Sequence, residues 1–449
     1  MNDISPQIDA TFRSGKFVIR GSRLFSYWVL LFVPAAMIQI LVGGHTVTFV
    51  DLWLLIFAFT QLAHAAIKAP RNINKHYLVM YILAFTAYLF VNCYGFAYAA
   101  DKAGVFKELA KWLEIMLISI SVMLYAGNLR RFRNIYWSMF FILVGVCIYH
   151  MAENILDGHL FQRMYVNVDW AIALSLPFLG LRWMRLLYVF VFAPCLILSY
   201  SRLSWASTSL IAVASVVLMK GINLMRRRVV IVLTMTVMVW IIVSIAVPRF
   251  ASIIAQRVLV TFNTSMDQSA FTRGAMIKAG IMDFIQHPLL GVGAGNFKNY
   301  VILHQANIIY FWLSPDALPN SPHSVVVQIA AELGTPGLIA MSFVLFAVLV
   351  GVKRGYKLAR SYRPIAQYSM GMVLFVIPLL VTLVASNVGD TDRVIWGIYF
   401  GLAMAMFRLH KCYSPKRRHW RLDSTALNQI GNYSTRAELP SAKSRDDGY

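Results

Sequence analysis

Two arginines and one histidine could do chemistry in a chain that otherwise runs from one apolar stretch to the next. They are Arg202, Arg273 and His323. Arginine guanidinium groups bind phosphate oxygens through paired hydrogen bonds. A neutral histidine can take a proton from a hydroxyl group. On one face of a molecule, these residues could hold a diphosphate leaving group and activate an alcohol, which is glycosyl transfer from a lipid-linked diphosphate sugar.

Each of these residues also has a purely structural explanation. Arg202 stands at the outer junction of two apolar runs, where an arginine can extend its guanidinium to the lipid headgroups. Arg273 could be a solvated side chain. Its place in the first turn of a helix expected over 271–286 gives a cation no benefit from the helix dipole, which favours another anionic partner. His323 could bond a carbonyl, yet the start of a helix favours the neutral ring that a base needs.

The elements that must position these residues are membrane helices. The chain has 449 residues, of which 59% are hydrophobic and only 13% charged, and its mean hydropathy is +0.63. Its apolar runs are long enough to cross a hydrocarbon layer of about 30 Å as helices, and helices satisfy their own backbone groups in lipid. We therefore predict an all-α polytopic membrane protein with about twelve spans. The predicted spans are 27–43, 48–67, 77–99, 109–126, 134–150, 168–181, 184–200, 204–219, 229–247, 336–352, 367–386 and 394–408.

The basic residues indicate how these spans are oriented. The net charge of +22 is spread over short clusters between spans, which argues against nucleic-acid binding. Thirty of the 41 Lys and Arg residues fall on one side of the predicted bundle and eleven on the other. Because cytoplasmic loops carry the excess of positive charge, both termini are expected in the cytoplasm. No cleavable signal peptide is expected, because the first 26 residues are polar and basic.

Four regions follow from this topology. They are an N-terminal bundle of about nine spans (1–247), an outer loop with the candidate chemistry (248–335), three C-terminal spans (336–410) and a largely disordered cytoplasmic tail (411–449). In the loop, the helix over 271–286 carries an apolar face of Ile277, Ile281, Phe284 and Ile285. This face suits a helix on the membrane surface or packed over the bundle.

The glycine run at 291–295 is predicted to be a tight turn that ends the preceding helix, because no strand precedes it as a dinucleotide fingerprint requires. Its amides could approach an anion, which alone is a weak signal. None of the four cysteines forms a C-x-x-C pair, so we expect neither a metal site nor a disulfide framework. The nearest acidic pair on the outer face is Asp390 and Asp392. We predict no cofactor and no metal, with the arginines replacing a cation.

The outer-face motifs resemble a known family. The string His287-Pro-Leu-Leu-Gly-Val-Gly-Ala-Gly-Asn-Phe297, the segment Pro322-His-Ser, the segment Ala331-Glu-Leu-Gly-Thr-Pro-Gly-Leu338 and the pattern Ser201-Arg-x-Ser-Trp205 are similar to the O-antigen ligase and polymerase superfamily. The motif resemblance covers roughly residues 198–345. The earlier spans match only in hydropathy.

The resemblance implies a GT-C-like membrane glycosyltransferase with a large periplasmic loop that contains short helices. Its donor is an undecaprenyl-diphosphate-linked glycan, its acceptor is lipid A–core or another glycan, and its location is the bacterial inner membrane, with the active site on the periplasmic face. By this resemblance His323 is the essential base, and Arg202 and Arg273 are the essential arginines that bind the diphosphate. Ser324 departs from the asparagine that many members have directly after the histidine.

The resemblance leaves several functions open. We favour a metal-independent, inverting O-antigen ligase. The alternatives with the same chemistry are an O-antigen or exopolysaccharide polymerase and a protein O-oligosaccharyltransferase. A lipid-linked oligosaccharide flippase or other transporter would need ionisable residues buried within the spans. The sequence offers few candidates: Glu114 and the uncharged but polar Gln39 within spans, with Asp51 and Asp169 near span ends.

Overall fold

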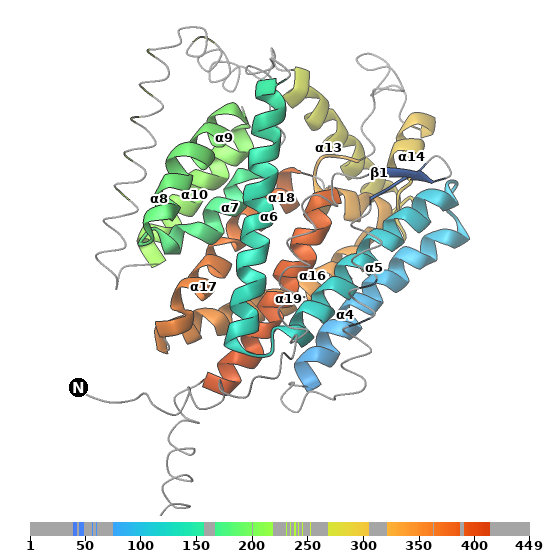
Figure 1. Cartoon of the computed structure of the whole chain (residues 1–449). Coiled ribbons are helices and arrows are strands. Elements are labelled where there is room, and N and C mark those ends of the chain that lie inside the picture. Colours follow the sequence, from blue (N-terminus) through green and yellow to red (C-terminus); the bar gives the residue numbers. More distant parts are fainter. Residues whose placement is uncertain are drawn as a thin grey trace, which may run out of the picture.

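The structure is a computed structural model that describes nine segments of the chain and several isolated positions between 56 and 252. The nine segments are residues 39–42, 45–48, 75–156, 167–199, 201–218, 268–304, 321–361, 363–386 and 390–413. Almost all of the described residues are helical (Figure 1). The predicted spans 48–67 and 229–247 and the tail beyond residue 413 fall outside the nine segments.

The helices follow one another with short connections. They are α4 (Lys75–Tyr94), η1 (Gly95–Ala97), α5 (Lys102–Tyr125), α6 (Leu129–Leu156), α7 (Val168–Ser175), η2 (Leu176–Phe178), α8 (Arg182–Leu187), η3 (Tyr188–Phe192), α9 (Ala193–Leu198), α10 (Arg202–Leu218), α13 (Gln268–Gln286), α14 (Phe297–His304), α16 (Val325–Ser361), α17 (Arg363–Leu374), α18 (Val376–Ala385) and α19 (Asp390–Tyr413).

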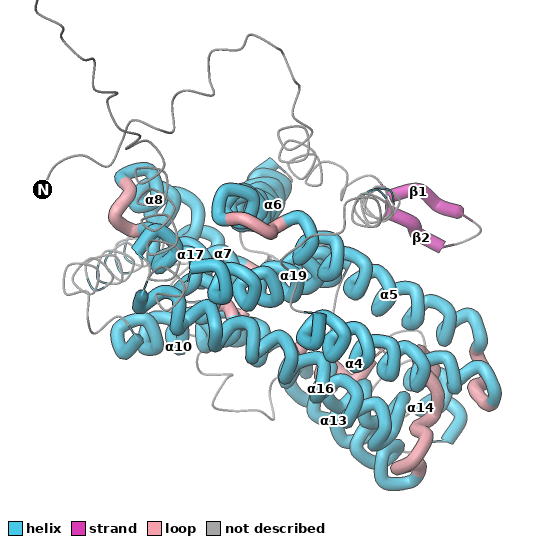
Figure 2. Tube along the Cα trace, turned by 90° about the horizontal axis from the view of Figure 1, so that it is seen from below, coloured by secondary structure: helices cyan, strands magenta, loops and turns pink. Residues whose placement is uncertain are grey.

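Two groups of helices pack around a shared core. In the first group α4, α5, α16 and α19 lie side by side, and in the second α7, α10, α17 and α18 pack together (Figures 1 and 2). Helix α17 packs on α16 and joins the groups. Small residues allow the closest approach: a Cβ atom at Gly401 of α19 would lie 2.5 Å from the Cβ of Val122 in α5. Such residues are enriched where membrane helices meet.

Four stretches of helix are long and apolar enough to cross a membrane among the described residues. They are Tyr77–Ala97, Leu129–Asn154, Val325–Ala359 and Pro364–Ala385. They coincide with the predicted spans 77–99, 134–150, 336–352 and 367–386. The other predicted spans that fall in the described segments are helical, but shorter, interrupted or more polar. The number of twelve spans therefore stays a prediction.

One hairpin departs from the predicted all-α fold. Strand β1 (Gln39–Val42) pairs antiparallel with β2 (His45–Thr48), with Val42 opposite His45. The first predicted span, 27–43, is therefore wrong at its C-terminal end. The reason is local: Gly43 and Gly44 form a dipeptide typical of two-residue hairpin turns, and β-branched residues follow it in β2. Hydropathy alone does not separate an apolar strand from the end of an apolar helix.

Candidate functional site

His323 occupies an unusual backbone position at the start of α16. Its φ of 56° lies in the left-handed region, and it is the one non-glycine residue with positive φ in the described part of the chain. Histidine adopts this region more readily than most residues, and such conformations cluster at active sites. The next residue, Ser324, caps α16: its Oγ accepts from the Val327 amide at 3.4 Å, and its carbonyl accepts from Gln328 at 2.8 Å. The predicted helix start is confirmed.

Helix α13, which carries Arg273, packs directly against the turn that holds His323. A Cβ atom at Gly280 would lie 2.6 Å from Cγ1 of Val327 and 3.4 Å from Cβ of Pro322, so only a glycine permits this approach. Arg273 precedes Gly280 by seven residues, which is about two helical turns, or about 10 Å, along the same face. The face of α13 that carries Arg273 is therefore the face that meets the His323 turn.

Two predicted details of α13 need correction. The helix begins at Gln268, three residues before the predicted start, so Arg273 lies in its second turn and not in its first. The helix dipole acts mainly in the first turn, so the dipole argument for an anionic partner of Arg273 is weakened. Of the two predicted alternatives for the apolar face, packing over the bundle is wrong for Ile281 and Ile285, which are 46% and 68% exposed. Helix α13 instead buries Met276, Ala279, Gly280 and Asp283.

Arg202 stands on a helix that is connected to α16 through α18. It is the first residue of α10 and is half-buried. Helix α10 packs on α18, and α18 packs on α16. The Ser324 hydroxyl beside His323 lies 3.5 Å from the Leu383 carbonyl of α18, a long contact. The structure thus places the three predicted residues at the N-terminus of α10, near the start of α13 and directly before α16, on helices that are linked by packing.

A kink in α16 explains the two motifs that flank His323. Gly334 is non-helical, with φ of 65°, and Pro336 has no amide hydrogen. The carbonyls of Ala331 and Glu332 therefore lose their helical donors. The glycine run replaces them: the amide of Val292 donates to Ala331 at 2.8 Å, and the amide of Gly293 donates to Glu332 at 2.9 Å.

The kink also donates hydrogen bonds back to the segment that contains the glycine run. The amide and the hydroxyl of Thr335 both donate to the carbonyl of Pro288, each at 2.8 Å. Gly291 has φ of 67°, and a Cβ atom there would lie 2.3 Å from the Glu332 carbonyl carbon. The prediction of a tight turn is confirmed. The amides of Val292 and Gly293 donate to helix carbonyls. These two amides are therefore not available to bind an anion.

The connection between α4 and α5 anchors the other side of the glycine run. The Asn296 side chain accepts from the amide of Asp101 at 2.7 Å and donates to its carbonyl at 3.0 Å. The Tyr98 hydroxyl donates to the Leu290 carbonyl. The Asp101 side chain in turn caps α5 by accepting from Gly104 at 3.0 Å. Residues 95–104, for which the sequence suggested no clear role, therefore help to fix the segment that supports α16.

Asp283 carries a perturbed carboxyl group near the candidate site. It lies in the buried face of α13, and burial raises its pKa from 3.8 to about 7. On the neighbouring helix α14, burial raises the pKa of Tyr300, and the charge of Asp283 raises it further. Asp283 was not singled out from the sequence. An acidic residue on the small-residue face of an otherwise amphipathic helix was the available signal.

Several ionisable groups are buried within the helical bundle. Arg393 donates to Glu114 at 3.2 Å between α19 and α5. The amide of Asn167 donates to Asp392 at 2.7 Å, so Asp392, predicted as part of the nearest acidic pair, is engaged with α7. Glu332 in α16 is 3% exposed. The bundle therefore holds more buried ionisable residues than the sequence indicated, and Glu332 was missed although its motif was recognised.

The comparison with known families bears on this same part of the chain. Residues 187–342 match the family model described as O-antigen ligase. The resemblance that the sequence motifs suggested is thereby confirmed. The matched segment runs from the end of α8 to α16 and contains all three predicted residues. No curated protein matches the chain.

The family match supports a coarse description of the protein. Four of its described helices are long and apolar enough to cross a membrane, and the matched segment is similar to the O-antigen ligases, a family of glycosyltransferase-like membrane enzymes. The roles of Arg202, Arg273 and His323 remain predictions.

Proposed function

We propose that the protein is an O-antigen ligase of the bacterial inner membrane. It transfers a polysaccharide from undecaprenyl diphosphate to lipid A–core on the periplasmic face, without a metal and with inversion at the anomeric carbon. The observation that carries the proposal is the family match over 187–342, which contains Arg202, Arg273 and His323. The close packing of α13 on the His323 turn supports it.

The proposed reaction is a single displacement. The neutral imidazole of His323 takes the proton from an acceptor sugar hydroxyl, and the oxygen attacks the anomeric carbon of the donor. The bond from that carbon to the phosphate oxygen breaks on the opposite side. Undecaprenyl diphosphate leaves with the electron pair, and the guanidinium groups of Arg202 and Arg273 stabilise its charge. A polymerase would use the same steps with a second lipid-linked glycan as acceptor.

The left-handed backbone conformation of His323 determines which substitution best tests its role as the general base. Asparagine tolerates the left-handed region, whereas alanine there costs about 1 kcal/mol or more. His323→Asn therefore removes the base with the least disturbance of the turn. We expect its turnover with defined donor and acceptor to fall at least about a hundredfold, while its thermal unfolding stays close to that of the wild type.

The measurement is the initial rate of transfer in nanodiscs at saturating donor and acceptor. His304→Asn is the matched control, because His304 is an exposed histidine at the end of α14. It should retain the wild-type rate. A His323→Asn protein that is folded and transfers at the wild-type rate would refute the base assignment.

A further inference from the structure

Glu332 lies where α16 meets the segment that connects α13 to α14. It is 3% exposed and follows His323 by nine residues on α16. The amide of Gly293 donates to its main-chain carbonyl at 2.9 Å, and the amide of Gly295 makes a weaker hydrogen bond to its side-chain carboxyl group. One residue of α16 therefore accepts hydrogen bonds from two amides of the glycine run.

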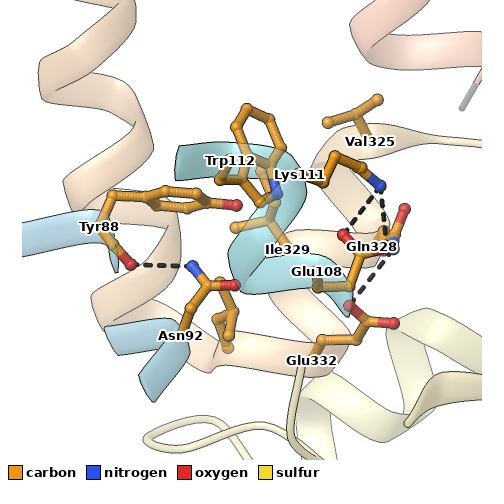
Figure 3. Close-up of a pocket in the computed structure, with 10 residues that line it drawn as sticks. Tyr88, Asn92, Glu108, Lys111, Trp112, Val325, Gln328, Ile329 and Glu332 are labelled. Carbon is orange, nitrogen blue, oxygen red and sulfur yellow. Dashed lines mark hydrogen bonds and ion pairs between the residues drawn. The ribbon is translucent and has the colours of Figure 1, made fainter. Parts of the chain in front are cut away.

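Other polar side chains surround the carboxyl group of Glu332 (Figure 3). The Gln328 amide donates to its Oε2 at 3.3 Å. On α5, Lys111 donates to Glu108 at 2.8 Å, and the Lys111 cation attracts the Glu332 carboxylate, whereas Glu108 repels it. The cavity that these residues line has room for about one water molecule. The cluster is therefore a packed contact among α4, α5 and α16 and not a ligand site.

A carboxyl group is energetically unfavourable at such a buried position. Replacement of a buried ionic group by an apolar side chain of similar volume is often neutral or stabilising. The hydrogen bond from the glycine run gives Glu332 a role that leucine cannot fill, because the Gly295 amide needs an oxygen acceptor. The contact with Gly295 is therefore the observation that explains a carboxyl group here.

The glycine run is part of one packed unit with α13 and α14. Phe297 begins α14 directly after the run, and a Cβ atom at Gly280 of α13 would lie 3.5 Å from the Phe297 ring. A small apolar cluster is shared by α13, α14 and α16, and it consists of Met276, Ala279, Phe297, Val301 and Ala331. A residue that fixes the glycine run on α16 therefore also fixes α13.

We propose that Glu332 is a positioning residue for the transfer reaction. Its carboxyl group holds the glycine run on α16, and the packed unit then holds Arg273 of α13 in a fixed place relative to His323. The proposal rests on the proposed transferase function. Glu332 contacts neither substrate in this account. It acts through Arg273, so its loss should weaken the use of the diphosphate donor.

The test compares two substitutions of Glu332. Leucine removes the acceptor for the Gly295 amide, whereas glutamine keeps one oxygen acceptor. We expect Glu332→Leu to lower kcat/KM for undecaprenyl-diphosphate oligosaccharide about tenfold, the effect of one buried hydrogen bond, and Glu332→Gln to stay within about threefold of the wild type. Glu153→Leu is the control and should keep the wild-type rate, because Glu153 is an exposed residue of α6 that pairs with His150.

A double-mutant cycle separates positioning from general destabilisation. If Glu332 acts through Arg273, Glu332→Leu should lower kcat/KM by less than about threefold when Arg273→Lys is already present. An equal loss with and without Arg273→Lys would show a structural role that is independent of the arginine. A Glu332→Gln protein as impaired as Glu332→Leu would show that the hydrogen bond is not the cause. Either result overturns the proposal.

Hydrogen exchange tests the same contact without turnover. In nanodiscs, the backbone amides of residues 291–296 should exchange about tenfold faster in Glu332→Leu than in the wild type, as measured by mass spectrometry, and at the wild-type rate in Glu332→Gln. If the wild type transfers nothing, the proposed function fails, and this exchange alone decides whether Glu332 holds the glycine run. Faster exchange in Glu332→Leu supports that role, and exchange equal to the wild type overturns it.

Discussion

Arg273 is the arginine whose position relative to His323 is best defined, because α13 packs on the His323 turn through Gly280. Lysine would keep the charge but lose the paired hydrogen bonds to a diphosphate. We expect Arg273→Lys to lower kcat/KM for the lipid-linked donor about tenfold or more, and Arg273→Ala to lower it further. Steady-state kinetics with varied donor measure this effect. Equal kcat/KM in the wild type and both variants would contradict the diphosphate role.

Asp283 should make the stability of the protein depend on pH. Its pKa is about 7 in the folded protein, against 3.8 for an ordinary aspartate. The folded state therefore holds a proton that the unfolded state has lost, and stability falls as the pH rises from about 4 to about 7. We expect Asp283→Asn to remove this loss. Its Tm should equal that of the wild type near pH 4 and exceed it at pH 8, as measured by tryptophan fluorescence in detergent. A wild-type advantage at pH 8 would contradict the assignment.

At the residue scale, motif matching found the candidate chemistry but not its partners. His323 and its helix start were predicted, because proline, serine and an apolar run mark them in the sequence. The burial of Glu332 could not be predicted, because it depends on the packing of α16 against helices that are distant in the sequence. The raised pKa of Asp283 could not be predicted from the sequence either, because burial depends on helices that are distant in the sequence.

Helix α13 offers a paired test at the element scale. Gly280 faces the His323 turn, where a Cβ atom would lie 2.6 Å from Val327, whereas a Cβ atom at Gly274 would meet nothing within 4 Å. Both glycines are inside the same helix, so alanine favours the helix equally at each position. We expect Gly280→Ala to move α13 away from α16 and to lower turnover about tenfold or more.

Gly274→Ala is the control for Gly280→Ala. Gly274→Ala should keep wild-type turnover and raise the free energy of unfolding by up to about 1 kcal/mol. Transfer rates and thermal unfolding of both variants measure the difference. If the two alanine variants have the same rate, the close packing of α13 on α16 does not position Arg273 for the reaction.

The sequence predicted the helices better than the contacts between the segments that connect them. The bounds of α13 and the start of α16 lie close to the predicted ones, because apolar periodicity and capping residues mark them, whereas α6 extends about five residues beyond each end of the predicted span 134–150. The pairing of the glycine run with the kink at Gly334 could not be found in this way. Pro336 does signal that the Glu332 carbonyl lacks a helical donor, but nothing local shows that Gly293, 39 residues earlier, supplies one.

At the scale of the whole molecule, the charge asymmetry predicts which side each segment faces. Asn299 is exposed on α14 and is expected on the periplasmic side, and Lys411 is exposed at the end of α19 and is expected in the cytoplasm. In a variant with its cysteines replaced by serine, Asn299→Cys should react with an impermeant maleimide in spheroplasts. Lys411→Cys should react only after the membrane is opened. The reverse pattern would contradict the predicted orientation.

The most direct test of the central claim is transfer itself. Purified protein in nanodiscs is mixed with undecaprenyl-diphosphate oligosaccharide and lipid A–core in the presence of EDTA, and the lipid A–core is followed by gel shift. We predict a shifted band that forms with the wild type and disappears with His323→Asn. A ladder of lengthened lipid-linked glycan with unshifted lipid A–core would make the protein a polymerase, and no product of either kind would contradict the proposed glycosyl transfer.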